Sequence, residues 1–250
     1  MVVWLFAGGG EAEIEGLVPF FRDNFPHCRF ERLTPARIKK GPKPGKKTYG
    51  PGLTGKGFAD QIKTILAVAL LSGSCDLILI LDCRDADKQR RIFSAAIDSV
   101  NNASGISRFI GFAAPELEAW IIADWENTFA GHVDFRSFHE GLRYRLSHNY
   151  NVPFDNPESF SEYDEKKDSC KEKLSQAIID AVFEESLRLN KRLERYSKQN
   201  HTPQLLRCAD PGKVADKCPF FKEVYNCLKK ISDYNALRGG RSFLALKLTP

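Results

Sequence analysis

The sequence predicts an α/β fold, in which a parallel sheet is flanked by helices and followed by a mainly helical C-terminal half. Two observations carry this prediction. Over residues 1–125, short apolar runs alternate with amphipathic helical patterns, which is typical of strand-helix-strand units with right-handed crossovers. The apolar runs then stop, and helical patterns follow. We therefore expect an α/β core in residues 1–125 and a helical region in residues 126–250.

The central strand is the clearest element. Leu77–Leu81 contains five aliphatic residues, and Asp76 precedes it. Because this run is short and apolar at every position, both faces of the strand should be buried. Val2–Ala7 and Arg108–Ala114 are predicted to be further buried strands, and Cys28–Leu33 is expected to be another strand.

Amphipathic patterns predict the helices. In the first part of the chain, one predicted helix begins at Glu11 and two others cover residues 58–71 and 90–101. A fourth begins at Pro115 and continues over residues 116–124. In the second part they cover 132–148, 166–198 and 220–231. Pro203 and Pro211 should interrupt residues 202–217.

Composition excludes several classes of protein. The seven cysteines are odd in number and form no CxxC pair, which argues against a disulfide framework and a zinc ribbon, and the five histidines show no zinc-ligand spacing. No apolar run approaches the roughly 20 residues that span a bilayer. Residues 1–7 lack the positive start of a signal peptide, so we expect a cytoplasmic protein without a membrane segment. The net charge of +5 permits nucleic-acid binding without implying it.

Three carboxylates follow the central strand. Asp82, Asp85 and Asp87 lie within six residues of one another. The carboxyl ends of parallel strands form the ligand crevice of open sheets, and crowded carboxylates repel unless a cation neutralises them. The cluster therefore favours a site for Mg²⁺ or Mn²⁺. The alternative is that Asp85 or Asp87 only caps the next helix.

A glycine turn follows the first strand. Gly8-Gly9-Gly10 leads into Glu11, but Glu13 stands where a dinucleotide fingerprint needs glycine, so that motif is excluded. Two interpretations of Glu11 stay open. Its carboxylate either faces the same crevice as Asp82 and Asp85, or it only complements the dipole of the helix that it begins.

Residues 37–56 form a basic segment without a single acid and with many Gly and Pro residues. Its lysines are Lys39, Lys40, Lys43, Lys46, Lys47 and Lys56. This segment is either a solvated loop or a clamp for the phosphate backbone of a nucleic acid. In both cases we expect it to be poorly ordered in the absence of a ligand. Residues 50–57 nearly match a P-loop, but Gly57 replaces the hydroxyl residue and no apolar strand precedes them, so nucleotide binding there is the weaker hypothesis.

The glycine-acid turn and the DxD-like cluster resemble the layout of Toprim domains, which topoisomerases, primases and OLD nucleases share. Three segments are also similar to the bacterial Toprim-like family catalogued as domain of unknown function 4276. They are Ala-Pro-Glu-Leu-Glu-Ala-Trp-Ile-Ile-Ala-Asp at 114–124, Arg-Tyr-Ser-Lys-Gln at 195–199 and Lys-Cys-Pro-Phe-Phe at 217–221. The resemblance implies a partner of the ABC-type or OLD-like ATPase class and a role in phage defence. It differs at one point: in Toprim enzymes glycine follows the first-strand glutamate, whereas Gly8–Gly10 precede Glu11, so either Glu11 is displaced by the turn or Gly9 holds its place.

Two hypotheses of function result. The first is a Mg²⁺- or Mn²⁺-dependent nuclease acting on DNA or RNA, in which Asp82 and Asp85 bind the metal and Glu11 is a further ligand or the general base. Asp87 and Glu116 would hold a second ion or orient the ligands of the first. The second hypothesis is a catalytically silent subunit that acts by binding an ATPase partner through its helical half.

Overall fold

The computed structural model describes residues 1–34, 53–82, 86–164 and 169–237, with the side chains at 11–14, 86, 87, 163, 169, 235 and 237 outside that description. The chain divides into two compact units: residues 1–112 with 226–250, and residues 113–225. This division differs from the boundary expected at residue 125, because the helix at 118–123 packs with later helices and residues from 226 belong to the first unit. None of the described helices is both long and apolar enough to cross a membrane.

The first unit contains a four-stranded parallel sheet, which confirms the predicted fold class. Its strands are β1 (Val2–Ala7), β2 (Arg29–Arg32), β3 (Leu77–Asp82) and β4 (Ser107–Phe112), in the order β2-β1-β3-β4. Every residue of β3 is buried, as its continuous aliphatic run predicts. Asp76 fixes the start of β3 against β1, because its Oδ2 accepts a hydrogen bond of 2.7 Å from the Val2 amide.

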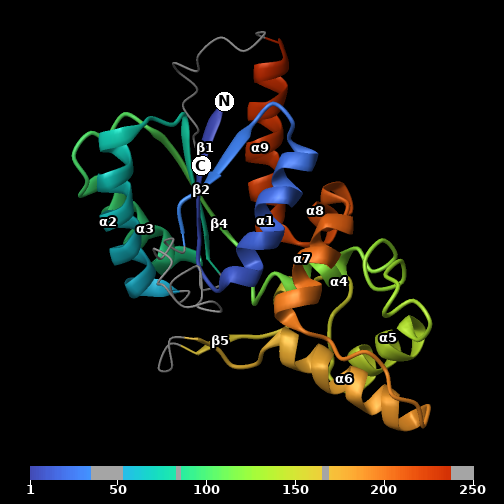
Figure 1. Ribbon diagram of the computed structural model, residues 1–250. Helices are drawn as coiled ribbons and strands as arrows, with labels where there is room; N and C mark the ends of the chain where they lie inside the picture. The colour runs from blue at the N-terminus through green and yellow to red at the C-terminus, as the bar shows by residue number, and fades with distance from the viewer. Residues whose placement is uncertain (35–52, 83–85, 165–168, 238–250) are drawn as a thin grey trace, which may run out of the picture. The chain divides into compact units, whose positions relative to one another are not determined.

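Helices cover both faces of this sheet (Figure 1). They are α1 (Glu11–Asn24), α2 (Gly55–Ser72), α3 (Ala86–Asp98) and the last part of α9 (Pro219–Leu237). Figure 1 shows α2 and α3 side by side on one face and α1 on the other. Phe58 of α2 meets Phe93 of α3 edge to face with ring centres 5.4 Å apart, so aromatic packing joins the two helices.

The second unit is mainly helical. Its elements are α4 (Glu118–Ala123), α5 (His139–His148), η1 (Pro157–Ser159), β5 (Tyr163–Asp164), β6 (Ser169–Cys170), α6 (Leu174–Arg188), α7 (Lys198–Cys208), α8 (Pro211–Lys217) and the start of α9. Trp120 lies at the centre of its core, fully buried and 4.4 Å from the Phe221 ring centre. This core forms because α4 is buried at every position, including Glu118.

Several predicted elements of the second half are wrong. The helix expected over 166–198 is replaced by β6 and α6, and α6 ends at Arg188 close to Asn190, whose φ of 47° lies in the left-handed region that asparagine tolerates. The antiparallel pair β5-β6 contradicts the expectation that strands stop after residue 125. The helix expected from 132 begins only at His139, and Pro203 lies inside α7 instead of interrupting it.

Candidate functional site

Asp82 ends β3 at a place where the sheet reverses its order. From β1 the chain crosses to β2 on one side, whereas from β3 it crosses to β4 on the other side. In open parallel sheets, ligands bind beyond the carboxyl ends of the strands at such a switch point. Ala7 pairs with Leu81, so Gly8 and Asp82 follow at the same level on neighbouring strands.

The Asp82 carboxylate is held by backbone from two other segments. Its side chain is buried, and Oδ2 accepts a hydrogen bond of 3.1 Å from the amide of Gly55. On the β1 side, a β-carbon added to Gly8 would lie 2.5 Å from Asp82 Oδ1. Gly9 has a φ of 92°, and its amide donates to the Leu53 carbonyl over 3.1 Å. The glycine turn therefore lets the backbone after β1 approach both the carboxylate and the start of α2.

Three of the described helices begin at this edge of the sheet. In a parallel sheet, α1 after β1, α2 before β3 and α3 after β3 all start at the carboxyl end of the strands. Helix N-termini carry partial positive charge, which favours carboxylates and phosphates nearby. Lys56 is exposed in the first turn of α2, next to the Gly55 amide that binds Asp82.

Gln89 is a functional candidate that the sequence argument missed. It lies in the first turns of α3 with only 1% of its surface exposed, and its Oε1 has no hydrogen-bond partner among the residues that the structure describes. It shares the buried stripe of α3 with Phe93 and Ile97. The sequence does contain one indication: Gln89 lies four positions before Phe93, where the amphipathic pattern of this helix predicts an apolar residue.

The oxygen atoms at this edge suit a hard divalent cation. Carboxylate and carboxamide oxygens, as on Asp82 and Gln89, are ligands that Mg²⁺ and Mn²⁺ accept. Within the described part of the chain, no group of three or more His, Cys, Asp or Glu side chains could hold a metal ion. A metal site here therefore depends on the further carboxylates predicted at Glu11, Asp85 and Asp87.

Most of these predicted partners fall outside the description. Glu11 begins α1 and Asp87 lies in α3, but only their backbones are described. Asp85 lies outside the described residues altogether, and so do the predicted nucleic-acid contacts Lys39, Lys40, Lys43, Lys46 and Lys47. Asp82 and Lys56 are the predicted residues whose side chains are described in the first unit.

Glu116 belongs instead to a buried polar network of the second unit. Its Oε2 accepts hydrogen bonds of 2.9 Å from both the amide and the hydroxyl of Ser175. Lys198 Nζ lies 2.8 Å from Glu116 Oε1 and 3.6 Å from Glu118 Oε2, so one ammonium group bridges two carboxylates. Burial alone would raise the pKa of Glu116, but Lys198 and the Ser175 hydrogen bonds outweigh it and hold this pKa below its usual value.

The same network contains the hydroxyl of Tyr196. This hydroxyl donates to Glu118 Oε1 over 3.0 Å, and Thr202 Oγ1 donates to the same oxygen over 2.7 Å. Burial and the negative charge of Glu118 raise the pKa of Tyr196 well above its ordinary value, so the phenol stays protonated. Segments 114–124 and 195–199, distant in sequence, thus meet through their polar residues.

The third of the family-like segments joins this unit through Glu158. Its carboxylate accepts hydrogen bonds from the amides of Phe220 and Phe221, at 2.7 and 3.1 Å, and from Trp120 Nε1 at 3.3 Å. Burial raises the pKa of Glu158 to about 7, against the lowering effect of these hydrogen bonds. All three segments therefore contribute to the polar interior of the second unit.

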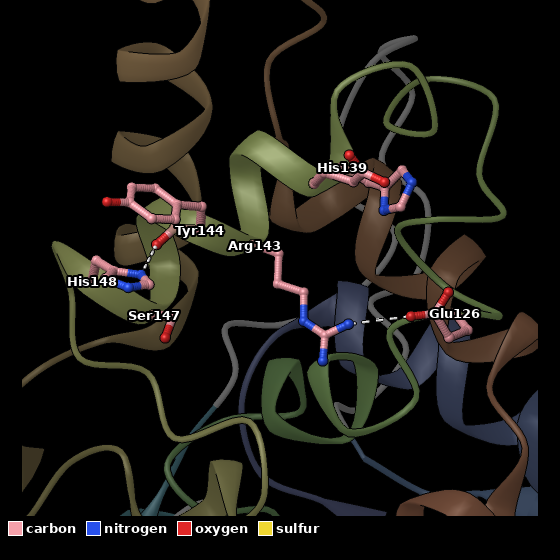
Figure 2. A pocket seen from close by; sticks show the side chains of 7 residues that line it. Glu126, His139, Arg143, Tyr144, Ser147 and His148 are labelled. Carbon is pink, nitrogen blue, oxygen red and sulfur yellow. Dashed lines mark hydrogen bonds and ion pairs between the residues drawn. The ribbon is translucent and has the colours of Figure 1, made fainter.

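A hollow of about 440 Å³ lies on the surface of the second unit along α5 (Figure 2). In it, the Tyr144 and His148 rings stack with centres 4.0 Å apart, and Arg143 pairs with Glu126 over 3.2 Å. His139 Nδ1 accepts a hydrogen bond of 3.3 Å from the Trp125 indole. The hollow thus combines exposed aromatic faces with one paired guanidinium group.

Comparisons with known proteins return no relative: no protein-family model, no curated protein and no solved structure matches the chain.

Proposed function

We propose that this protein is a Mg²⁺- or Mn²⁺-dependent phosphodiesterase of the Toprim type that cleaves DNA or RNA. The observation that carries the proposal is the position of Asp82. A buried carboxylate ends the central parallel strand at the switch point of the sheet, enclosed by the Gly8 turn and the N-terminus of α2. This edge is where open α/β sheets bind ligands, and its oxygen donors suit hard cations.

The residues of this edge have separate roles in the proposal. Asp82 and Asp85 hold the cation, Glu11 is the remaining ligand or the general base, and Asp87 supports a second ion or orients the ligands. Glu116, which the sequence analysis assigned to the same role, is excluded from it because Ser175 and Lys198 bind its carboxylate in the second unit. When bound, the cation would supply positive charge that stabilises the transition state of phosphate hydrolysis. In that reaction a water oxygen forms a bond to phosphorus, one P–O bond breaks, and the leaving sugar oxygen takes up a proton. Lys56 and the basic lysines before it would attract the nucleic-acid backbone.

The biological setting follows from the family resemblance alone. Members of the Toprim-like family that the sequence resembles are often encoded beside ABC-type ATPases in phage-defence loci, so we propose that this protein is the effector of such a system with an ATPase partner. Cytoplasmic localisation is part of this proposal.

The decisive experiment compares wild type with Asp82→Asn. Mn²⁺ should raise the melting temperature of the wild-type protein by mass action and leave that of the variant unchanged. Cleavage of plasmid, single-stranded DNA and tRNA should require Mg²⁺ or Mn²⁺ and be lost in the variant. The matched control is Asp210→Asn, because Asp210 caps α8 by accepting a 2.7 Å hydrogen bond from the Gly212 amide and asparagine caps a helix nearly as well. An equal Mn²⁺ response in wild type and Asp82→Asn would remove Asp82 as a ligand and refute the proposal.

A catalytically silent binding subunit is the second candidate. It is favoured by Phe183 and Leu187 on α6, which lie one turn apart and are 55% and 65% exposed. Under this alternative, Phe183→Ser with Leu187→Ser would abolish binding of the ATPase partner, while Asp82→Asn would leave the biological activity intact. The nuclease proposal predicts the opposite result for Asp82→Asn.

A further inference from the structure

We infer that the hollow along α5 binds an unpaired nucleobase, which stacks on the Tyr144 ring. This inference rests on the proposed function and narrows its substrate class to nucleic acid with a single-stranded part. All residues that line the hollow belong to the second unit, whereas Asp82 belongs to the first. The volume of about 440 Å³ lies within the range of roughly 300–1,000 Å³ that ligand pockets occupy.

One outward face of α5 forms most of the hollow. Its residues recur at i, i+3, i+4, i+7 and i+8, which places them on a single stripe, and all of them are exposed: Glu140, Arg143, Tyr144, Ser147 and His148. The outward face of a helix normally carries charged and polar residues. The aromatic pair on this face is therefore a feature that the core of the second unit does not require.

The Tyr144 ring is a platform for stacking (Figure 2). It lies against the His148 ring with centres 4.0 Å apart and planes 19° from parallel, and Tyr144 is 60% exposed. Since His148 covers one face of the tyrosine ring, the other face is available to a ligand. Every nucleobase has a flat π face that stacks on aromatic side chains. In a duplex both faces of a base are already stacked on its neighbours, so this platform selects an unpaired base.

The two histidines of the hollow contribute one donor and one acceptor. His139 Nδ1 accepts a hydrogen bond from the Trp125 indole, so the proton of the neutral ring is on Nε2. His148 Nδ1 lies 2.9 Å from the Tyr144 carbonyl, which only accepts, so Nε2 of the neutral ring is an acceptor. Neither Nε2 atom has a protein partner in the part of the chain that the structure describes. The edges of nucleobases also carry donors and acceptors side by side, which suits this pair.

The charges of the hollow favour a neutral ligand group over a phosphate. Arg143 pairs with Glu126 over 3.2 Å, and its guanidinium carbon lies 5.0 Å from the Phe154 ring centre, so both its charge and its position are fixed. Glu140 adds a further negative charge. Binding here should therefore come from stacking and hydrogen bonds and depend little on salt, whereas contacts to phosphate groups weaken as the salt concentration rises.

Two substitutions of Tyr144 test the platform. Binding of labelled single-stranded DNA and RNA of roughly 12 nucleotides, and of the matching duplexes, is measured by fluorescence anisotropy in EDTA at about pH 8, where metal-dependent cleavage is absent and histidine rings are ordinarily neutral. Tyr144→Ala should weaken single-strand binding about 5- to 150-fold at low and high salt and leave duplex binding unchanged. Tyr144→Phe keeps the ring and should bind like wild type. The matched control is Phe183→Ala, which removes a ring that is 55% exposed on α6 and outside the hollow.

A loss confined to Tyr144→Ala and to single strands supports the inference. Wild-type affinity in Tyr144→Ala, or an equal loss for duplexes, overturns it, and the proposed nuclease then still stands if Asp82→Asn has lost its Mn²⁺ response. A second arm uses AMP alone. If Tyr144→Ala loses AMP binding but keeps its affinity for single strands, the hollow takes a free nucleotide and the assignment to single strands is overturned. Binding of single strands through Tyr144 by a protein that cleaves no substrate with Mn²⁺ supports the inference and refutes the nuclease proposal alone.

Discussion

The Asp82 carboxylate leaves no room for a side chain on Gly8, because a β-carbon there would lie 2.5 Å from Oδ1 and 3.1 Å from Cγ. Gly8→Ala should therefore destabilise the protein by about 1–3 kcal/mol, the usual range for overpacking. Combining it with Asp82→Ala should recover most of that loss, since the second change removes the atoms in conflict. Urea unfolding of the single and double variants measures this coupling.

Gly105→Ala is the control for this prediction. A β-carbon at Gly105 would meet no atom within 4 Å, so this variant should be as stable as wild type or more stable by up to about 1 kcal/mol. If Gly8→Ala unfolds at the same urea concentration as Gly105→Ala, the close packing of Asp82 against the glycine turn is wrong.

The sequence predicted the first unit well because its strands are marked by physical patterns. Leu77–Leu81 is aliphatic throughout, and a strand of this kind is stable only between two layers of helices. The second unit was predicted poorly, because tertiary contacts override local preference there. Pro203 is tolerated inside α7, and Glu118 is buried because Tyr196 and Thr202 hydrogen-bond to it from 78 and 84 residues away.

The candidate site was predicted in part. The position of Asp82 follows from the rule that parallel strands present their carboxyl ends to ligands, and the structure places it there. Gln89 was not predicted, because a single glutamine in an amphipathic pattern does not reveal whether its carboxamide is buried. Asp85 and the side chains of Glu11 and Asp87 lie outside the described residues, so their roles stay predictions.

Lys198→Met should destabilise the second unit by about 2–4 kcal/mol, because it leaves two largely buried carboxylates without their shared cation. The low pKa of Glu116 means that its pairing stabilises the fold above the unfolded value near 4.5 and that this stability is lost as the pH falls. The variant should therefore lose less stability than wild type on acidification. Melting temperatures from neutral pH down to roughly pH 3 test this, because the loss occurs below the unfolded pKa of Glu116.

Lys171→Met is the control for Lys198→Met. Lys171 and Glu162 form an ion pair with side chains 53% and 81% exposed, so its removal should leave the melting temperature unchanged. Equal melting temperatures for the two variants would contradict the proposed importance of the buried network.

His201 should make the protein less stable in weak acid. Burial lowers its pKa, the nearby His132 adds to this effect, and Asp134 opposes it. The ring is held unprotonated at Nδ1, which accepts a hydrogen bond of 2.8 Å from the Ser197 amide. A group with a lowered pKa stabilises the fold above its unfolded value of 6.5, and this stability is lost as the pH falls.

The test variant is His201→Asn, whose side-chain oxygen can replace the acceptor without titrating. Its melting temperature should fall less than that of wild type between about pH 7.5 and 5.5. An identical fall in both proteins would exclude His201 as the group responsible.

Replacing Lys39, Lys40, Lys46 and Lys47 with Ala should weaken nucleic-acid binding. For each phosphate group that the variant no longer neutralises, the slope of log affinity against log salt should become shallower by about 0.9 for duplex DNA. Binding measured by fluorescence anisotropy at several salt concentrations tests this. A matched variant removes four exposed lysines elsewhere, namely Lys191, Lys222, Lys229 and Lys230. If both variants bind nucleic acid with the same affinity and salt dependence, the affinity depends only on the net charge of the protein, and the phosphate-clamp hypothesis is wrong.

The first unit is assembled from two separated stretches of chain, with residues 113–225 between them. Cys28 and Cys227 illustrate this, since both thiols are buried. Burial raises the pKa of Cys227 to about 12, and the nearby Cys28 thiol adds to this effect. During synthesis on the ribosome, the strands emerge long before the segment from 226 that belongs with them. The first unit can therefore be completed only after residues 113–225 have been translated. Until then, apolar surface that the last segment covers stays exposed, and chaperones bind such surface.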